Sequence, residues 1–286
     1  MIKIILLSGF LGSGKTTLLN HLIKTMEKTA IIINEYGKES VDDKLVHGDF
    51  DVQEISNGSI FCTCRSDQFL NVLLRAKAFD VETILVENSG LADPTGMGSI
   101  MDMLEKVSPN TFEYEGSICV LDALNYHKVK STLPVVKNQV IGSSLIVINK
   151  IDLVGDVYLT ELTDELVSEG HQVVQTQYGQ VDDVIMSRER TLSNGLITKT
   201  IGISKLHLDA SEYSLEQVEK WLEKIGPLTL RIKGFINDSG HFLVQSVLGD
   251  YRVEAWPNSE NAFLEIIYKS NDQVKSKILE TWKNLL

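Results

Sequence analysis

A glycine-rich loop directly after an apolar run constrains this fold more than any other feature of the sequence. Residues 2–7 are largely apolar, and G-F-L-G-S-G-K-T follows at residues 9–16, a full match to G-x-x-x-x-G-K-[ST]. Glycines let the backbone curl so that successive N–H groups converge on phosphate oxygens. Lys15 is then expected to reach the β- and γ-phosphates of a nucleotide, and the Thr16 hydroxyl to bind Mg²⁺. The other predicted phosphate-binding residues are Gly9, Gly12, Ser13, Gly14 and Thr17.

The rest of the chain alternates between strand and helix patterns. Short apolar runs at residues 30–33, 83–86, 117–121 and 145–148 are typical of strands covered on both faces, and segments of helical periodicity separate them. This alternation predicts an α/β fold of the P-loop NTPase kind, with a mostly parallel sheet, over residues 1–190. Beyond a linker at residues 188–195, four strand patterns and two helical patterns predict a smaller α+β domain over residues 196–286.

Composition excludes several classes of function. The net charge of −12 disfavours a nucleic-acid partner, because the chain as a whole does not attract phosphate backbones. No apolar stretch approaches the roughly 18 residues needed to span a bilayer, so no membrane role is expected. Three cysteines form no disulfide framework and fit a reducing compartment, which makes a cytoplasmic location the expectation. Cys119, inside a predicted strand, is expected to be a small core residue.

A second motif indicates which nucleotide is bound. The apolar run at residues 145–148 leads into Asn149, Lys150, Ile151 and Asp152, an N-K-x-D tetrad. The Asp152 carboxylate can accept hydrogen bonds from N1–H and the exocyclic amine of guanine, a two-point contact that adenine does not offer. Asn149 can contact another edge of the purine, and the Lys150 stem can lie along its plane. A carboxylate left unpaired by adenine is costly, so the tetrad predicts GTP rather than ATP.

Two acidic loops complete the predicted nucleotide site. Glu87 lies at the carboxyl end of a predicted buried strand, where open α/β sheets bind ligands. It is a candidate for the Mg²⁺ shell or for positioning the attacking water. The alternative is a structural carboxylate that caps a helix or ties a loop. Gly90 would let this loop swing toward a γ-phosphate. Glu35 and Asp42 follow another predicted strand, where they are either nucleotide-responsive acids or ordinary surface acids. The sequence contains no obvious arginine finger or catalytic glutamine, so hydrolysis without a partner is expected to be slow.

A cysteine pair lies between these two loops. Cys62 and Cys64 supply two thiolates, whereas a tetrahedral Zn²⁺ site needs four ligands, so two more must come from elsewhere or from a partner. Glu35 and His47 are conceivable additions. The alternative is that both cysteines are simply small residues on a tight loop.

Taken together, these motifs resemble the CobW-type family of P-loop GTPases, relatives of the accessory GTPases for urease and hydrogenase metallocentre assembly. The resemblance rests on residues 9–17, on N-E-Y-G at 34–37 with Asp42, on E-N-S-G-L-A-D-P at 87–94, on N-K-I-D at 149–152 and on R-I-K-G-F at 231–235. It implies a GTP-hydrolysing metallochaperone or cofactor-assembly protein, with Lys15, Glu87 and Asp42 as candidate catalytic residues. Mg²⁺ and Zn²⁺ or Co²⁺ are the implied metals. A client metalloenzyme or cofactor-assembly protein is the implied partner, and homodimerisation is a further expectation.

The sequence departs from this family at the metal motif. Ser59, Phe61 and Cys62 stand where the family has C-x-C-C, so only the last cysteine is retained, and Cys64 falls just beyond it. One alternative is therefore a conformational chaperone of a corrinoid or other metalloenzyme that carries no metal itself. A P-loop small-molecule kinase or ligase is a further alternative, against which the N-K-x-D tetrad and the lack of an acceptor-site signature speak.

Overall fold

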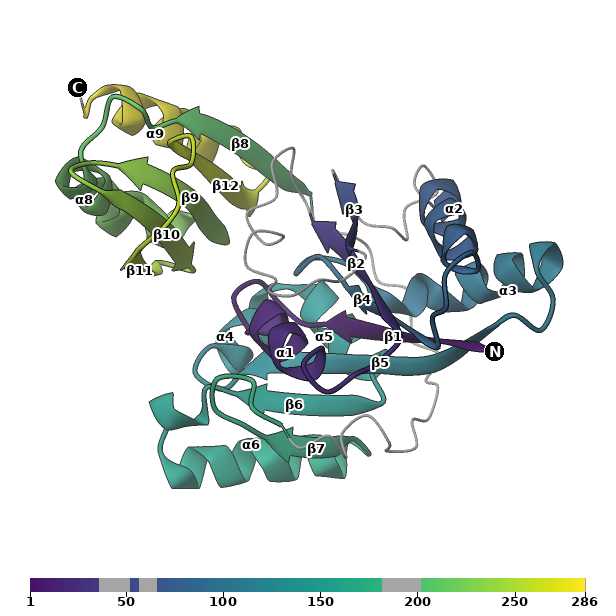
Figure 1. The fold of residues 1–286 in the computed structure, drawn as a ribbon. Coiled ribbons are helices and arrows are strands. Elements are labelled where there is room, and N and C mark those ends of the chain that lie inside the picture. The colour runs from purple at the N-terminus through teal and green to yellow at the C-terminus, as the bar shows by residue number, and fades with distance from the viewer. Residues whose placement is uncertain (36–51, 57–65, 182–201, 286) are drawn as a thin grey trace. The chain divides into compact units, whose positions relative to one another are not determined.

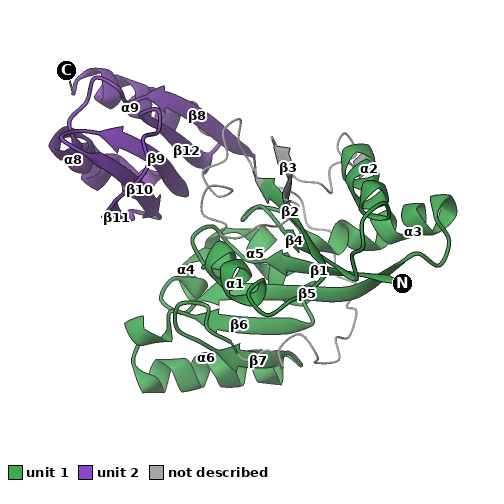
Figure 2. Ribbon diagram, viewed as in Figure 1, with its two compact units in different colours: residues 1–199 green, residues 200–286 purple. Residues whose placement is uncertain are grey.

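The computed structural model describes residues 1–35, 52–56, 66–181 and 202–285. The chain divides into two compact units, Met1–Lys199 and Thr200–Leu286 (Figure 2). The linker predicted at residues 188–195 lies outside the described residues.

The N-terminal unit is built on a seven-stranded sheet of order β3-β2-β4-β1-β5-β6-β7 (Figure 1). Every pair of neighbouring strands in it is parallel, which confirms the predicted α/β class. β1 lies between β4 and β5, so the chain leaves β1 at the point where the strand order switches sides, and ligands of open α/β sheets bind at such points. The strands are β1 (Ile2–Ser8), β2 (Thr29–Glu35), β3 (Val52–Ser56), β4 (Thr83–Glu87), β5 (Phe112–Asp122), β6 (Leu145–Asn149) and β7 (Gln172–Gln175).

Helices cover both faces of this sheet. Alternate residues of β1 serve the two faces: Ile5 belongs to the core cluster that contains the α1 leucines, whereas Ile4 belongs to the cluster with Phe69 of α2 and Leu104 of α3. Both clusters are almost free of solvent exposure, which explains why the central strands are apolar on successive residues. The helices are α1 (Lys15–Leu22), α2 (Ser66–Ala76), α3 (Met97–Val107), α4 (Tyr126–Thr132), α5 (Pro134–Ile141) and α6 (Asp156–Ser168), with short 3₁₀ turns η2 (Pro94–Gly96) and η3 (Ile151–Leu153).

The C-terminal unit is an antiparallel sheet of order β11-β10-β9-β12-β8 with two helices, which confirms the predicted α+β class. Alternate strand residues such as Ile232 and Ile266 pack with Trp221 of α8 and Trp282 of α9 in one core cluster. A capping box between Ser214 and Gln217 fixes the start of α8. The elements are β8 (Ile203–Asp209), α8 (Leu215–Ile225), η4 (Gly226–Leu228), β9 (Arg231–Asn237), β10 (His241–Val247), β11 (Asp250–Ala255), β12 (Phe263–Lys269) and α9 (Asp272–Lys283). In the described parts of both units, every helix is too short or too polar to cross a membrane.

Candidate nucleotide site

The loop between β1 and α1 has the backbone that its glycines predict. Gly9, Gly12 and Gly14 all have positive φ angles, of 130°, 71° and 104°. A Cβ on Gly9 would lie 2.2 Å from the Val120 carbonyl oxygen, and a Cβ on Gly14 would lie 2.2 Å from Asn149 Nδ2, so only glycine fits. Gly14 is also the N-cap of α1, and no side chain caps that end. The positive end of the α1 dipole lies at this loop, as at the helix N-termini that bind anions.

Three of the predicted phosphate and metal residues lie together at this end of α1. Lys15 is 8% exposed, and its Nζ donates to the carbonyl oxygen of Phe10 at 3.3 Å, so the ammonium lies over the loop. The Thr16 hydroxyl donates to Glu87 Oε1 at 2.8 Å, and Glu87 is buried at the end of β4. A hydroxyl and a carboxylate are hard oxygen ligands of the type Mg²⁺ prefers, so this pair fits such an ion. Ser13 is buried in the loop, whereas Thr17 is exposed in the first turn of α1.

Asn149 connects the phosphate loop to the rest of the predicted base site. Its Nδ2 donates to the Ser13 carbonyl oxygen at 2.9 Å, and its Oδ1 accepts from the Gly179 N–H at 3.1 Å. Asn149 is only 3% exposed, so both bonds are shielded from water. Gly179 lies against the first turn of α1, since a Cβ there would be 2.8 Å from the Leu18 nitrogen. The side chain thus fastens three segments to one another, a role that the sequence-based assignment to the purine edge did not include.

Lys150 and Asp152 lie on the turn that follows β6. Lys150 has a left-handed backbone (φ 60°, ψ 37°), and its Nζ forms a 2.6 Å ion pair with Asp122 Oδ2 at the end of β5. Asp152 is exposed in η3, where its carboxylate is accessible to a ligand. The pairing partner Asp122 was missed from sequence. The only available signal was its place at the end of an apolar run, one strand away from the tetrad.

The loop after β4 packs against the phosphate loop. A Cβ on Gly90 would lie 2.7 Å from the Leu11 nitrogen, so the two backbones are in direct contact. Gln139 of α5, fully buried, holds this loop by donating to the carbonyl oxygens of Gly90 and Ala92 at 3.2 and 3.0 Å. The predicted swing of Gly90 would therefore have to break contacts with both Leu11 and Gln139.

The model of the family described as "CobW/HypB/UreG, nucleotide-binding domain" matches residues 3–176, more than half of the chain. The chain belongs to this family. The match spans the phosphate loop, Glu87 and the N-K-x-D tetrad, which confirms the resemblance inferred from those motifs.

Individual relatives of this CobW/HypB/UreG chain are similar at moderate identity. The zinc chaperone YjiA of Escherichia coli (strain K12) is 32% identical over 167 residues, covering 54% of this chain and 51% of YjiA. The zinc-regulated GTPase metalloprotein activator 1 of Dictyostelium discoideum is 34% identical over 128 residues, 39% of this chain and 25% of that protein. The zinc chaperone CobW of Sinorhizobium sp is 24% identical over 320 residues, 89% of this chain and 88% of that protein. The chain thus spans about half of YjiA and about a quarter of the Dictyostelium discoideum protein.

Solved structures of relatives were also found. The Zn(II)-bound YjiA GTPase from Escherichia coli has a TM-score of 0.45 at 19% identity, covering 100% of this chain and 99% of that one. HypB from Helicobacter pylori in complex with nickel has a TM-score of 0.45 at 17% identity, covering 63% of this chain and 80% of that one.

Several predicted residues of this CobW/HypB/UreG member fall where the structure gives no side chain. Asp42, Cys62 and Cys64 lie outside the described residues, and Glu35 ends β2 but its side chain is not among those described. Within the described part of the chain, no group of three or more His, Cys, Asp or Glu side chains is placed to hold a metal ion. Cys119 is fully buried in β5, and burial raises the pKa of its thiol from 9.0 to about 12, so it is a core residue as expected.

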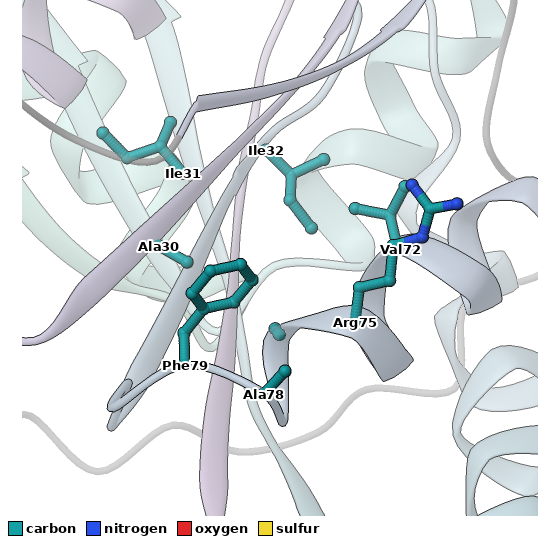
Figure 3. A pocket seen from close by; sticks show the side chains of 8 residues that line it. Ala30, Ile31, Ile32, Val72, Arg75, Ala78 and Phe79 are labelled. Atoms are coloured by element: carbon teal, nitrogen blue, oxygen red, sulfur yellow. The ribbon is translucent and has the colours of Figure 1, made fainter.

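A cavity of about 300 Å³ lies apart from these residues (Figure 3). It is bounded by Ala30 and Ile32 on β2 and by Val72, Arg75 and Phe79 on and after α2. None of the predicted site residues that the structure describes lines it, and its β2 residues precede the carboxyl end of the strand, where the nucleotide residues gather. The cavity is therefore not the nucleotide site.

Proposed function

We propose that this chain binds and hydrolyses GTP to GDP and phosphate, and that its nucleotide state controls the handling of a metal ion or of a client metalloenzyme. The observation that carries the proposal is the pair of bonds from Asn149 to Ser13 and Gly179. The bond to the Ser13 carbonyl joins the N-K-x-D tetrad to the phosphate loop, and the bond from the Gly179 N–H holds Asn149 in place, so one ligand with a guanine at one end and phosphates at the other can engage both motifs.

The base site supports guanine over adenine. Asp152 presents an exposed carboxylate from η3, and guanine offers it the N1–H and the exocyclic amine. Adenine has neither donor in that arrangement and would desolvate the carboxylate without replacing its hydrogen bonds to water. Under this proposal the stem of Lys150, whose ammonium is paired with Asp122, lies along the base plane.

The phosphate end supports hydrolysis. Lys15 lies over the loop and can follow the γ-phosphate as negative charge develops on it, and the uncapped end of α1 adds N–H donors. Thr16 and Glu87 would hold Mg²⁺, which when bound neutralises charge on the β- and γ-phosphates.

The relatives support a role in metal handling, since YjiA and CobW are named zinc chaperones. Under this proposal Zn²⁺ or Co²⁺ is cargo, held by Cys62, Cys64 and Glu35 together with groups from a partner. A second candidate is a conformational chaperone that carries no metal. The replacement of two C-x-C-C positions by Ser59 and Phe61 favours this candidate.

One experiment separates the two candidates. Zn²⁺ and Co²⁺ are titrated calorimetrically into the protein loaded with GDP and then with a non-hydrolysable GTP analogue. Binding that depends on nucleotide and is lost in Cys62→Ser/Cys64→Ser supports the metal carrier, because coupling between the sites is what that role requires. Absence of metal binding in both states supports the client chaperone.

The same preparation tests the GTPase itself. Lys15→Ala is expected to abolish GTP turnover, and turnover at the wild-type rate in that variant would overturn the assignment of the phosphate loop.

A further inference from the structure

Asp122 has the contacts of a residue that acts on the base site through Lys150. It ends β5, directly beside Asn149 at the end of β6, and it is nine-tenths buried. Its Oδ2 receives the Lys150 ammonium at 2.6 Å and the Asn125 Nδ2 at 3.1 Å. Its Oδ1 accepts from the Leu124 and Asn125 backbone N–H groups at 3.0 and 3.3 Å. Three hydrogen bonds besides the ion pair with Lys150 therefore hold the Asp122 carboxylate in place.

An anchor for the Lys150 side chain is expected to strengthen nucleotide binding. A long lysine side chain loses rotamer entropy when it is immobilised. The ion pair with Asp122 immobilises Lys150 in the nucleotide-free protein, and its side chain remains 20% exposed. A base that packs along the stem would then not have to order it, and preorganisation of this kind strengthens binding.

We propose that Asp122 is a positioning residue for guanine-nucleotide binding: it holds the Lys150 stem in the orientation that the base packs against. This inference rests on the proposed function, because Lys150 matters only if the N-K-x-D turn receives a base. Asp122 itself needs no contact with the nucleotide. Its effect should be the same for GDP and GTP, since both carry the same base.

The alternative role for Asp122 is purely structural. Its Oδ1 bonds to Leu124 and Asn125 form a turn that begins α4, and loss of this turn would affect the fold whether or not Lys150 is present. Asp122→Asn separates the two roles, because an amide oxygen still accepts the backbone N–H groups while the negative charge on Oδ2 disappears. Asp122→Ser serves the same purpose if the asparagine variant folds poorly, since a serine hydroxyl can also accept these bonds.

The test is a double-mutant cycle on nucleotide affinity with the full chain. Kd values for GDP and for a non-hydrolysable GTP analogue are measured by calorimetry in wild type, Asp122→Asn, Lys150→Met and the double variant. Asp122→Asn is expected to raise the Kd for both nucleotides about 3- to 10-fold, which is the range expected from the cost of ordering one long side chain. In the Lys150→Met background the same substitution is expected to change Kd less than twofold, because the ammonium it acts through is gone. Melting temperatures of the nucleotide-free proteins are measured in parallel.

Each other outcome contradicts the proposal. An equal loss of affinity in the presence and absence of the Lys150 ammonium would show that Asp122 acts through the fold. A Kd within twofold of wild type in both Asp122→Asn and Asp122→Ser would show that Lys150 needs no anchor. If wild type binds GDP and GTP but the variants do not differ from it, this inference fails and the proposed function stands. If wild type binds neither nucleotide, both fail.

Discussion

Asn149→Ala should destabilise the protein even when no nucleotide is present. The substitution removes the acceptor of the Gly179 N–H and the donor to the Ser13 carbonyl, at 3.1 and 2.9 Å. Because Asn149 is 3% exposed, water does not readily replace either bond. A buried group left without its partner costs about 1–3 kcal/mol, so the two together predict a loss of about 2–6 kcal/mol in the free energy of unfolding.

Thermal unfolding of the nucleotide-free protein, followed by far-UV circular dichroism, measures this loss. At about 2–4 °C per kcal/mol for a unit of this size, the transition should fall by about 4–24 °C. Asp152→Ala is the matched control from the same tetrad. Asp152 is exposed, and its replacement should change stability by about 0.5 kcal/mol or less. A melting temperature of Asn149→Ala within about 1 °C of wild type would refute the reasoning, because Asn149 would then act on the base alone.

Two further predictions concern a loop glycine and a buried thiol. In Gly14→Ala the alanine must adopt the left-handed backbone of this position, which costs about 1–2 kcal/mol, and its Cβ displaces Asn149, so nucleotide affinity measured by calorimetry should fall more than about tenfold. In the control Gly98→Ala, in α3, the added Cβ meets nothing within 4 Å, and stability should rise by about 0.5–1 kcal/mol. An equal change in nucleotide affinity in the two variants would contradict the loop geometry. Burial raises the pKa of Cys119 from 9.0 to about 12, so the folded state retains the thiol proton over that window and stability should fall with rising pH by about 1.4 kcal/mol per unit above pH 9. Urea unfolding at pH 8 to 11 should show this fall in the free energy of unfolding in wild type and not in Cys119→Ala. The same dependence of the free energy of unfolding on pH in both proteins would show that the thiol does not contribute.

The central strands were predictable from sequence because burial on both faces leaves a simple apolar signal. The runs at residues 83–86 and 145–148 correspond closely to β4 and β6, whose residues are almost all buried. β7 escaped prediction because it is an edge strand of four residues, Gln172–Gln175, with polar residues at both ends. β8 was also missed, although its polar and apolar residues alternate, with Leu206 and Leu208 on the core face, which is a pattern typical of a half-buried strand.

The nucleotide residues were predictable for a different reason. Gly9, Gly14 and Lys15 follow one another along the chain, so their local spacing already determines the loop that they form. Contacts between distant segments were not predictable. Asp122 and Lys150 are 28 residues apart, and Asn149 and Gly179 are 30 apart; only the order of β5, β6 and β7 in the sheet brings them together.

The most direct test of the central claim is a comparison of GDP and ADP affinity in wild type and in Asp152→Asn. Calorimetric Kd values are measured for both nucleotides with Mg²⁺ present. Wild type is expected to prefer GDP by about 100-fold or more, and Asp152→Asn is expected to lose most of this preference, because an amide cannot accept both guanine donors. Equal affinity of wild type for GDP and ADP, or an unchanged preference in Asp152→Asn, would contradict the reading of the tetrad as a guanine site.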